Sequence, residues 1–157
     1  MIHLSVAGIS RCYFLNKKKL NDIVIFILKS IGVYEANLSI IFTTDSKIKH
    51  LNYLYRKKNR PTDILAFSMQ EGRRLKRDSS ILGDIVISVD RAKKQAGAFD
   101  STFEKETYLY IIHGILHLVG YDDERPLLRK RMRKKESEIL NVLLRRISRK
   151  KHKRISS

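Results

Sequence analysis

The sequence predicts a single α+β domain in which helices pack on a mixed sheet of about four strands. Its 157 residues suit one domain, and a hydrophobic content of 43% is ordinary for a globular protein with a core. Short β-branched or alternating segments are interspersed with segments of helical periodicity. One long helix is apolar on most faces, which places it at the centre of the fold.

Two elements are expected at the N-terminal end. Apolar and polar residues alternate over residues 2–6, which predicts a half-buried strand with His3 on its exposed side. Apolar residues then recur at helical spacing over residues 16–31, and Gly32 follows as a residue that ends helices. This segment therefore predicts the first helix.

The next segments predict a second strand and a second helix. Residues 37–43 are rich in β-branched and aromatic side chains, which favour strands. Thr44 or Asp45 can cap the helix that follows. That helix must end before Pro61, because the residue preceding a proline is displaced from helical geometry. The apolar residues on its expected inner face are Ile48, Leu51, Leu54 and Tyr55.

Two further strands flank a polar segment in the middle of the chain. A strand is expected over residues 64–69, directly after turn-forming residues at 61–63. Another is expected over residues 82–89, where apolar and polar residues alternate around Gly83 and Asp84. Residues 71–80 lie between them, are polar and charged, and predict a surface loop or hairpin tip.

Three helices are expected in the C-terminal half. The first is a short helix over residues 90–98. Ser101 and Glu104 have the spacing of a capping box, which opens the long apolar helix that runs through Leu118. Residues 127–147 carry an apolar stripe with basic residues around it, which predicts a packing helix with a cationic outer face.

The charge balance is the strongest compositional signal. The chain has 33 Lys and Arg against 16 Asp and Glu, a formal net charge of +17. Residues 125–157 hold 14 of the basic residues and two of the acidic ones. From residue 149 onward no core residues are available, so we expect a basic, disordered tail over 149–157. A segment this basic attracts polyanions, RNA in the first place, and an anionic membrane surface is the less favoured partner class.

Other compositional features set the expected compartment and cofactors. A single cysteine, Cys12, excludes an intramolecular disulfide and indicates a core or surface residue in a reducing cytosol. The longest apolar run, residues 23–28, is too short to span a bilayer, and residues 1–10 lack the basic start of a signal peptide. No glycine-rich phosphate loop is present, so no nucleotide cofactor is expected. We therefore expect a cytoplasmic protein without a membrane partner.

The motif HGILHLVGYDD, residues 113–123, has the spacing of a metal site. Residues four apart lie on one face of a helix, so His113 and His117 can direct their imidazoles at one ion. Gly120 can adopt the left-handed conformation that ends a helix and turns the chain back. Asp123 follows three residues later, where it can offer a third ligand.

The motif differs from the metzincin pattern H-E-x-x-H-x-x-G-x-x-H at two positions. Gly114 stands where the metzincin glutamate acts as general base, so hydrolysis of peptides by the usual route is disfavoured. Asp123 stands where the third histidine would be. Two imidazole nitrogens, one carboxylate oxygen and a water are an accepted catalytic zinc set, so the motif predicts one Zn²⁺ ion on a metzincin-like helix.

Alternatives remain open at this point. Asp122 and Glu124 are rival third ligands. The simplest structural interpretation is a buried apolar helix whose histidines hydrogen-bond to backbone, followed by an acidic loop without a metal.

Three stretches together resemble the YbeY family of bacterial rRNA maturation factors. They are LNYLYRKKNRPTDILAFS at 51–68, LGDIVIS at 82–88 and HGILHLVGYDD at 113–123. Their order is that of the family, and the resemblance covers roughly residues 45–125. The family motif usually ends in Tyr-Asp-His, so Asp123 departs from it at the third zinc ligand.

The resemblance implies a site and a domain organisation. Arg56 falls on the functional arginine of the family, whose guanidinium could clamp a phosphate near the metal. The segment around Asp84 would line the cleft, with Asp84 either a partner of a metal ligand or a turn residue. A YbeY-like metal-dependent endoribonuclease domain would occupy residues 1–148, and the basic tail residues 149–157.

The resemblance also implies a function. This is a zinc-dependent, single-strand-specific endoribonuclease that matures the 3′ end of 16S rRNA and takes part in late ribosome quality control. Its partners would be single-stranded RNA, the small-subunit rRNA and the ribosome. The alternative is a ribosome-associated RNA-binding factor without catalysis, whose metal site is structural. A metal-dependent protease is a third possibility, disfavoured by Gly114.

Overall fold

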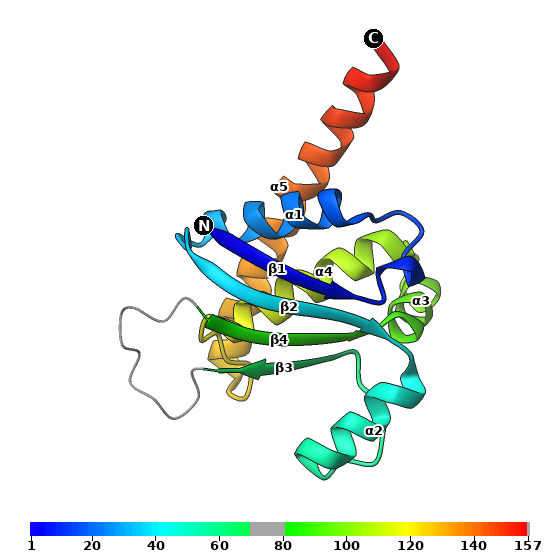
Figure 1. Ribbon diagram of the computed structural model, residues 1–157, viewed down its shortest axis with the longest axis vertical. Coiled ribbons are helices and arrows are strands. Elements are labelled where there is room, and N and C mark those ends of the chain that lie inside the picture. Colours follow the sequence, from blue (N-terminus) through cyan, green and yellow to red (C-terminus); the bar gives the residue numbers. More distant parts are fainter. Residues whose placement is uncertain (70–80, 157) are drawn as a thin grey trace.

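A four-stranded mixed sheet forms one layer of the computed structural model, which describes residues 1–69 and 81–156 (Figure 1). The strand order is β1-β2-β4-β3. β1, β2 and β4 run parallel, and β3 pairs antiparallel with β4. The predicted mixed sheet is therefore confirmed, whereas the loop predicted at 71–80 lies outside the described residues. The strands are β1 (Ile2–Ala7), β2 (Ala36–Thr43), β3 (Ile64–Ser68) and β4 (Ile81–Ser88).

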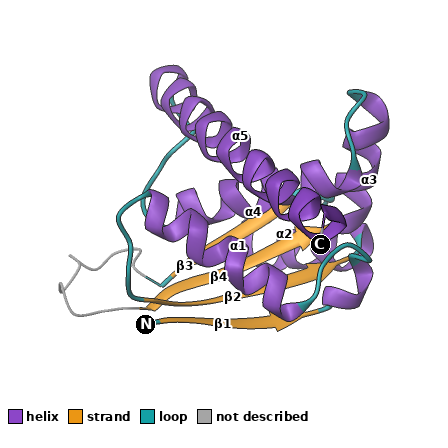
Figure 2. Ribbon diagram, turned by 90° about the horizontal axis from the view of Figure 1, so that it is seen from above, coloured by secondary structure: helices purple, strands orange, loops and turns teal. Residues whose placement is uncertain are grey.

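Helices cover both faces of this sheet unequally. Figure 2 shows α1, α4 and α5 over one face. On the other face, Ile48 of α2 packs against Leu65 of β3 and Val86 of β4 in a small separate cluster. The larger cluster therefore lies between the sheet and the first group of helices. The helices are α1 (Lys17–Ser30), α2 (Asp45–Arg56), α3 (Val89–Ala98), α4 (Phe103–Leu118) and α5 (Pro126–Ser156), with a short 3-10 helix η1 (Ile9–Arg11) after β1.

The long apolar helix is central, as predicted. Ile111, Ile112 and Ile115 of α4 are fully buried between the sheet and the other helices. Its predicted cap at Ser101 is wrong by one residue: Thr102 is the N-cap, and its hydroxyl accepts a hydrogen bond from the Lys105 amide at 3.0 Å. The reason is that the Ser101 amide donates to Ala96 and so still belongs to the end of α3.

The last helix is longer than expected. We expected a disordered tail from residue 149, but in the structure α5 continues to Ser156. Residues 149–156 contain no glycine or proline, and lysine and arginine are good helix formers whose charge suits a helix C-terminus. Met132, Ile139 and Leu143 are buried, but the C-terminal turns project away from the sheet and the other helices (Figure 1).

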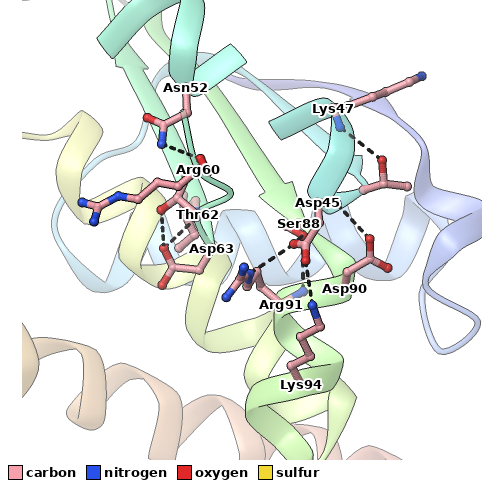
Figure 3. A network of polar contacts seen from close by, with 12 residues as sticks. Asp45, Lys47, Asn52, Arg60, Thr62, Asp63, Ser88, Asp90, Arg91 and Lys94 are labelled. Carbon is pink, nitrogen blue, oxygen red and sulfur yellow. Dashed lines mark hydrogen bonds and ion pairs between the residues drawn. The ribbon is translucent and has the colours of Figure 1, made fainter. Parts of the chain in front are cut away.

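A polar network fixes the start of α2 against the start of α3 (Figure 3). The Asp45 carboxylate accepts hydrogen bonds from the Ser88 hydroxyl at 2.7 Å, Arg91 Nε at 3.2 Å and Lys94 Nζ at 3.0 Å. The Asp45 amide in turn donates to the Asp90 carboxylate at 2.8 Å. Burial alone would raise the pKa of Asp45, but the bonds from Ser88 and Lys94 and the two nearby cations outweigh it, so that this pKa is lowered.

Cys12 belongs to the core. Its side chain is fully buried, and burial raises the pKa of the thiol to about 11 although the Lys93 charge opposes the shift. Among the described residues, no helix combines the length and the apolar character needed to cross a membrane.

Candidate metal centre

The two histidines of the motif lie one above the other on the last turns of α4. His113 and His117 are four residues apart, and their Nε2 atoms are 3.0 Å from each other. Both side chains are partly buried. The predicted histidine pair is therefore formed, and both Nε2 atoms face a common point at the edge of the core.

The end of α4 turns the chain back toward this pair. Gly120 has a φ of +104°, in the region that favours glycine. The Gly120 amide donates to the His117 carbonyl at 3.1 Å, and the Tyr121 amide donates to the Leu116 carbonyl at 2.9 Å. These two bonds form a Schellman motif, which satisfies carbonyls of the last helical turn. The helix end predicted at Gly120 is thus formed by a defined motif.

Asp123 is the acidic residue that the structure brings to the histidines. Its Oδ2 atom lies 3.9 Å from His113 Nε2 and 3.6 Å from His117 Nε2. Asp122 instead accepts a hydrogen bond from the Glu124 amide at 2.9 Å. The Asp123 carbonyl accepts a bond from Arg129 Nε at 3.0 Å, which ties the loop to α5. Among the described residues, only His113, His117 and Asp123 form a cluster with ligand spacing.

The donor set fits a divalent cation such as zinc. Two imidazole nitrogens and one carboxylate oxygen leave a fourth position open, which is the composition of catalytic zinc sites. Ligand atoms bound tetrahedrally at about 2.0–2.1 Å lie roughly 3.3 Å from one another. The three separations between these atoms range from 3.0 Å to 3.9 Å. The cluster can therefore close on one ion with only small side-chain movements.

Glu136 of α5 is a site residue that the sequence analysis missed. Its Oε1 atom hydrogen-bonds to His113 Nδ1, and the residue is only 9% exposed. A carboxylate on Nδ1 holds the proton there and leaves the Nε2 lone pair for an ion. The one available signal was a charged residue within an apolar stripe, since Glu136 lies between the buried Met132 and Ile139 on α5.

The two histidines titrate in opposite directions. Burial alone would lower the pKa of His113, but its hydrogen bond to the Glu136 carboxylate and the charges of Glu136, Asp63 and Asp123 outweigh burial and raise that pKa. Burial lowers the pKa of His117, and the neighbouring His113 lowers it further. His117 is therefore the histidine that more readily stays neutral and able to bind a cation.

Gly114 occupies a position that has no room for a side chain. A Cβ atom built there would lie 2.7 Å from Cγ2 of Ile85 on β4, which is too close for a real contact. Helix α4 thus packs directly on the sheet at the position where metzincins carry their glutamate base. This packing disfavours any side chain, and so a glutamate base, at position 114.

Arg56, which the family resemblance implied as a phosphate clamp, is the last residue of α2. Its Nη2 atom donates a hydrogen bond to the Ala66 carbonyl of β3 at 3.3 Å. Within residues 1–69 and 81–156, its side chain bonds to this carbonyl and not to a candidate metal ligand. The segment after α2 is fixed by the buried Asn52, whose amide donates to the Arg60 carbonyl at 2.9 Å (Figure 3). Arg56 therefore sits on an anchored helix end beside β3.

Two further predictions are corrected. On α2, Leu54 and Tyr55 are exposed, while Asn52 takes the buried position beside Ile48 because the loop carbonyl needs a donor. Asp84 is neither a turn residue nor a partner of a metal ligand. It lies within β4, on the face opposite Ile85, where its carboxylate accepts a hydrogen bond from the Ser39 hydroxyl of β2.

Comparison with known proteins identifies the family. The sequence model described as Endoribonuclease YbeY matches residues 13–144. A protein of that name from Pelotomaculum thermopropionicum is 43% identical over 120 residues, covering 74% of this chain and 79% of its own length. Its counterpart from Geobacter metallireducens is 33% identical over 142 residues, covering 89% and 95%.

A solved structure shows the same fold. The solution structure of TM1509 from Thermotoga maritima aligns with a TM-score of 0.57 and 27% identity, covering 93% of each chain. The fold, the two histidines at the end of the central helix and these matches agree. The chain belongs to the YbeY family of endoribonucleases.

Proposed function

We propose that this protein is a metal-dependent endoribonuclease that cuts single-stranded RNA in the cytoplasm. Its role would be maturation of the 3′ end of 16S rRNA and late ribosome quality control. The observation that carries the proposal is the convergence of His113, His117 and Asp123 within 4.8 Å of one another at the end of a buried helix. Family membership supports RNA as the substrate.

His113, His117 and Asp123 would hold one zinc ion. When bound, zinc would supply Lewis-acid activation of water and neutralise charge on the phosphoryl group. Asp123 replaces one neutral imidazole by a carboxylate, so the centre would carry a lower net charge than a three-histidine site. We expect it to be the weaker Lewis acid of the two.

The remaining groups of this chain would orient ligands and substrate. Glu136 holds His113 in the orientation and tautomer that a metal ligand requires. No side chain at position 114 is available as a general base. Arg56 would bind two oxygens of the scissile phosphate and neutralise developing charge, for which its position on an anchored helix end is suitable.

A second function is favoured by one observation. Asp123 departs from the third histidine of the family, which is compatible with a weak or structural metal site in a ribosome-associated RNA-binding factor. The two functions differ in one property: only the endoribonuclease loses a chemical activity when its metal ligands are removed.

Cleavage of an end-labelled single-stranded RNA, with zinc or with chelator, tests the proposal. We expect zinc-dependent cuts from the wild-type protein, none from His113→Ala or Asp123→Ala, and normal cuts from Asp122→Ala as the matched control. A duplex of the same sequence should resist cleavage. RNA bound equally by all variants and cut by none of them would instead establish the binding factor.

A further inference from the structure

A cationic groove lies between α1 and the C-terminal half of α5, at the other end of α5 from the candidate metal centre. It has a volume of about 460 Å³, and Ile23, Phe26 and Ile147 form its apolar floor. Two neighbouring hollows share Phe26, Arg146 and Lys150 with it. The basic residues that α5 contributes to the groove are Arg146, Lys150, Lys151, Lys153 and Arg154.

Positive charge exceeds negative charge in this groove. The acidic groups nearby are Asp22 in the wall and Glu104, which forms a salt bridge with Lys19 at 3.4 Å. Within residues 1–69 and 81–156, no salt bridge involves Lys150 or Lys153. Like charges three or four residues apart repel each other along a helix. A bound polyanion would relieve this repulsion.

An aromatic ring and a guanidinium lie together on the groove floor. The Arg146 guanidinium is 5.2 Å from the centre of the half-buried Phe26 ring. Grooves that bind single-stranded nucleic acid combine cations along the backbone with aromatic or guanidinium planes on which bases stack. A membrane-binding helix would instead present several large apolar side chains. In the last turns of α5 the one exposed large apolar residue is Ile155.

Helix α5 links the groove to the metal centre at a fixed distance. Glu136 contacts His113, and Lys150 follows it by 14 residues on the same helix. At 1.5 Å per residue this separation is about 21 Å. A stacked strand that rises roughly 3.4 Å per nucleotide would cover it with about six nucleotides. The family match ends at residue 144, so most of the basic wall lies outside the matched region.

We propose that this groove is a second RNA-binding site, which holds the phosphodiester backbone of a single strand whose other part lies at the metal centre. The inference rests on the proposed function, because it assumes that the metal centre takes RNA. It adds a length requirement: an RNA must extend about six nucleotides from the cleavage site to reach the groove.

Binding of RNA in chelator, measured by fluorescence anisotropy, tests the groove without requiring cleavage. The variant is Lys150→Gln/Lys153→Gln. The matched control is Lys47→Gln/Lys49→Gln, which changes net charge equally on the exposed face of α2, far from the end of α5 (Figure 1). Two RNAs are compared: one of about four nucleotides, and one of about 16 that can occupy both sites.

We expect the groove variant to bind the longer RNA about tenfold more weakly at low salt, with a salt slope reduced by about 1.4. The control variant should bind both RNAs within about twofold of wild type, and the groove variant should lose less affinity for the shorter RNA, which cannot occupy both sites at once. An equal loss of RNA affinity in both variants would show a general effect of net charge and overturn the proposal. So would unchanged RNA binding together with groove-dependent binding to phosphatidylserine vesicles. Groove-dependent binding by a protein that cuts no RNA when zinc is supplied would support the groove and contradict only the endoribonuclease.

Discussion

The two ends of α5 are built on opposite principles. Near its start, Glu136 is 9% exposed and directs a single contact at His113. Near its end, exposed lysines and arginines face an open groove. A buried contact is short-ranged and depends on orientation, whereas exposed charges act additively and are screened by salt. One helix thus contributes a buried contact to the candidate metal centre and exposed charges to the groove, and mutations should distinguish the two.

The largest effect is expected from removing the buried contact. Glu136→Ala should weaken zinc binding by about 10–100-fold, because His113 loses the partner that fixes its ring and tautomer. Competition with a zinc-binding dye measures this affinity directly. Glu138→Ala, on the exposed side of the same helix, is the matched control and should bind zinc normally. Equal affinity in all three proteins would show that the contact does not position His113.

Packing of α4 on the sheet gives the next effect. Gly114→Ala should lower the free energy of unfolding by about 1–3 kcal/mol, because the new methyl group would overlap the Ile85 side chain. Gly97→Ala on α3 is the control: nothing lies within 4 Å of its Cβ position. Alanine there should stabilise the helix by about 0.5–1 kcal/mol. Urea titrations that gave both changes the same sign would contradict the tight packing at Gly114.

The Asp45 network should make the free energy of unfolding depend on pH. Asp45→Asn should cost about 1–3 kcal/mol at neutral pH, because the variant loses the charge that Arg91 and Lys94 pair with. The folded-state pKa of Asp45 lies below 3.8, so its contribution is fully present above that value and is lost as pH falls through the folded-state pKa. Urea titrations at several pH values should show the difference from wild type shrinking in acid.

The smallest effect on stability is expected at the exposed end of α5. A chain ending at residue 148 should unfold with a free energy within about 0.5 kcal/mol of the full chain, because residues 149–156 are exposed. Its zinc affinity should be unchanged. Its affinity for long RNA should fall by at least as much as that of the double lysine variant. A large loss of stability would contradict the predicted domain limit of 1–148.

Local patterns predicted much of the fold and the histidine pair. Alternation and helical spacing placed all four strands and the helices α1 to α4 near their observed bounds, because they reflect contacts between neighbours in the chain. The i, i+4 histidines and Gly120 likewise act within one helix and its end. Predictions were wrong where a residue contacts another segment of the chain. The Ser101 amide donates a hydrogen bond to the end of α3, and Asn52 occupies the buried position on α2.

The elements, the spacing of the histidine pair and the cationic end of the chain could be predicted from local patterns, because each depends on residues a few positions apart. Three features required the folded chain: Asp123 rather than Asp122 joins the pair, Glu136 supports His113, and Ile85 leaves no room at Gly114. These last two contacts join segments more than twenty residues apart. Such contacts depend on how helices pack on a sheet, which no local pattern specifies.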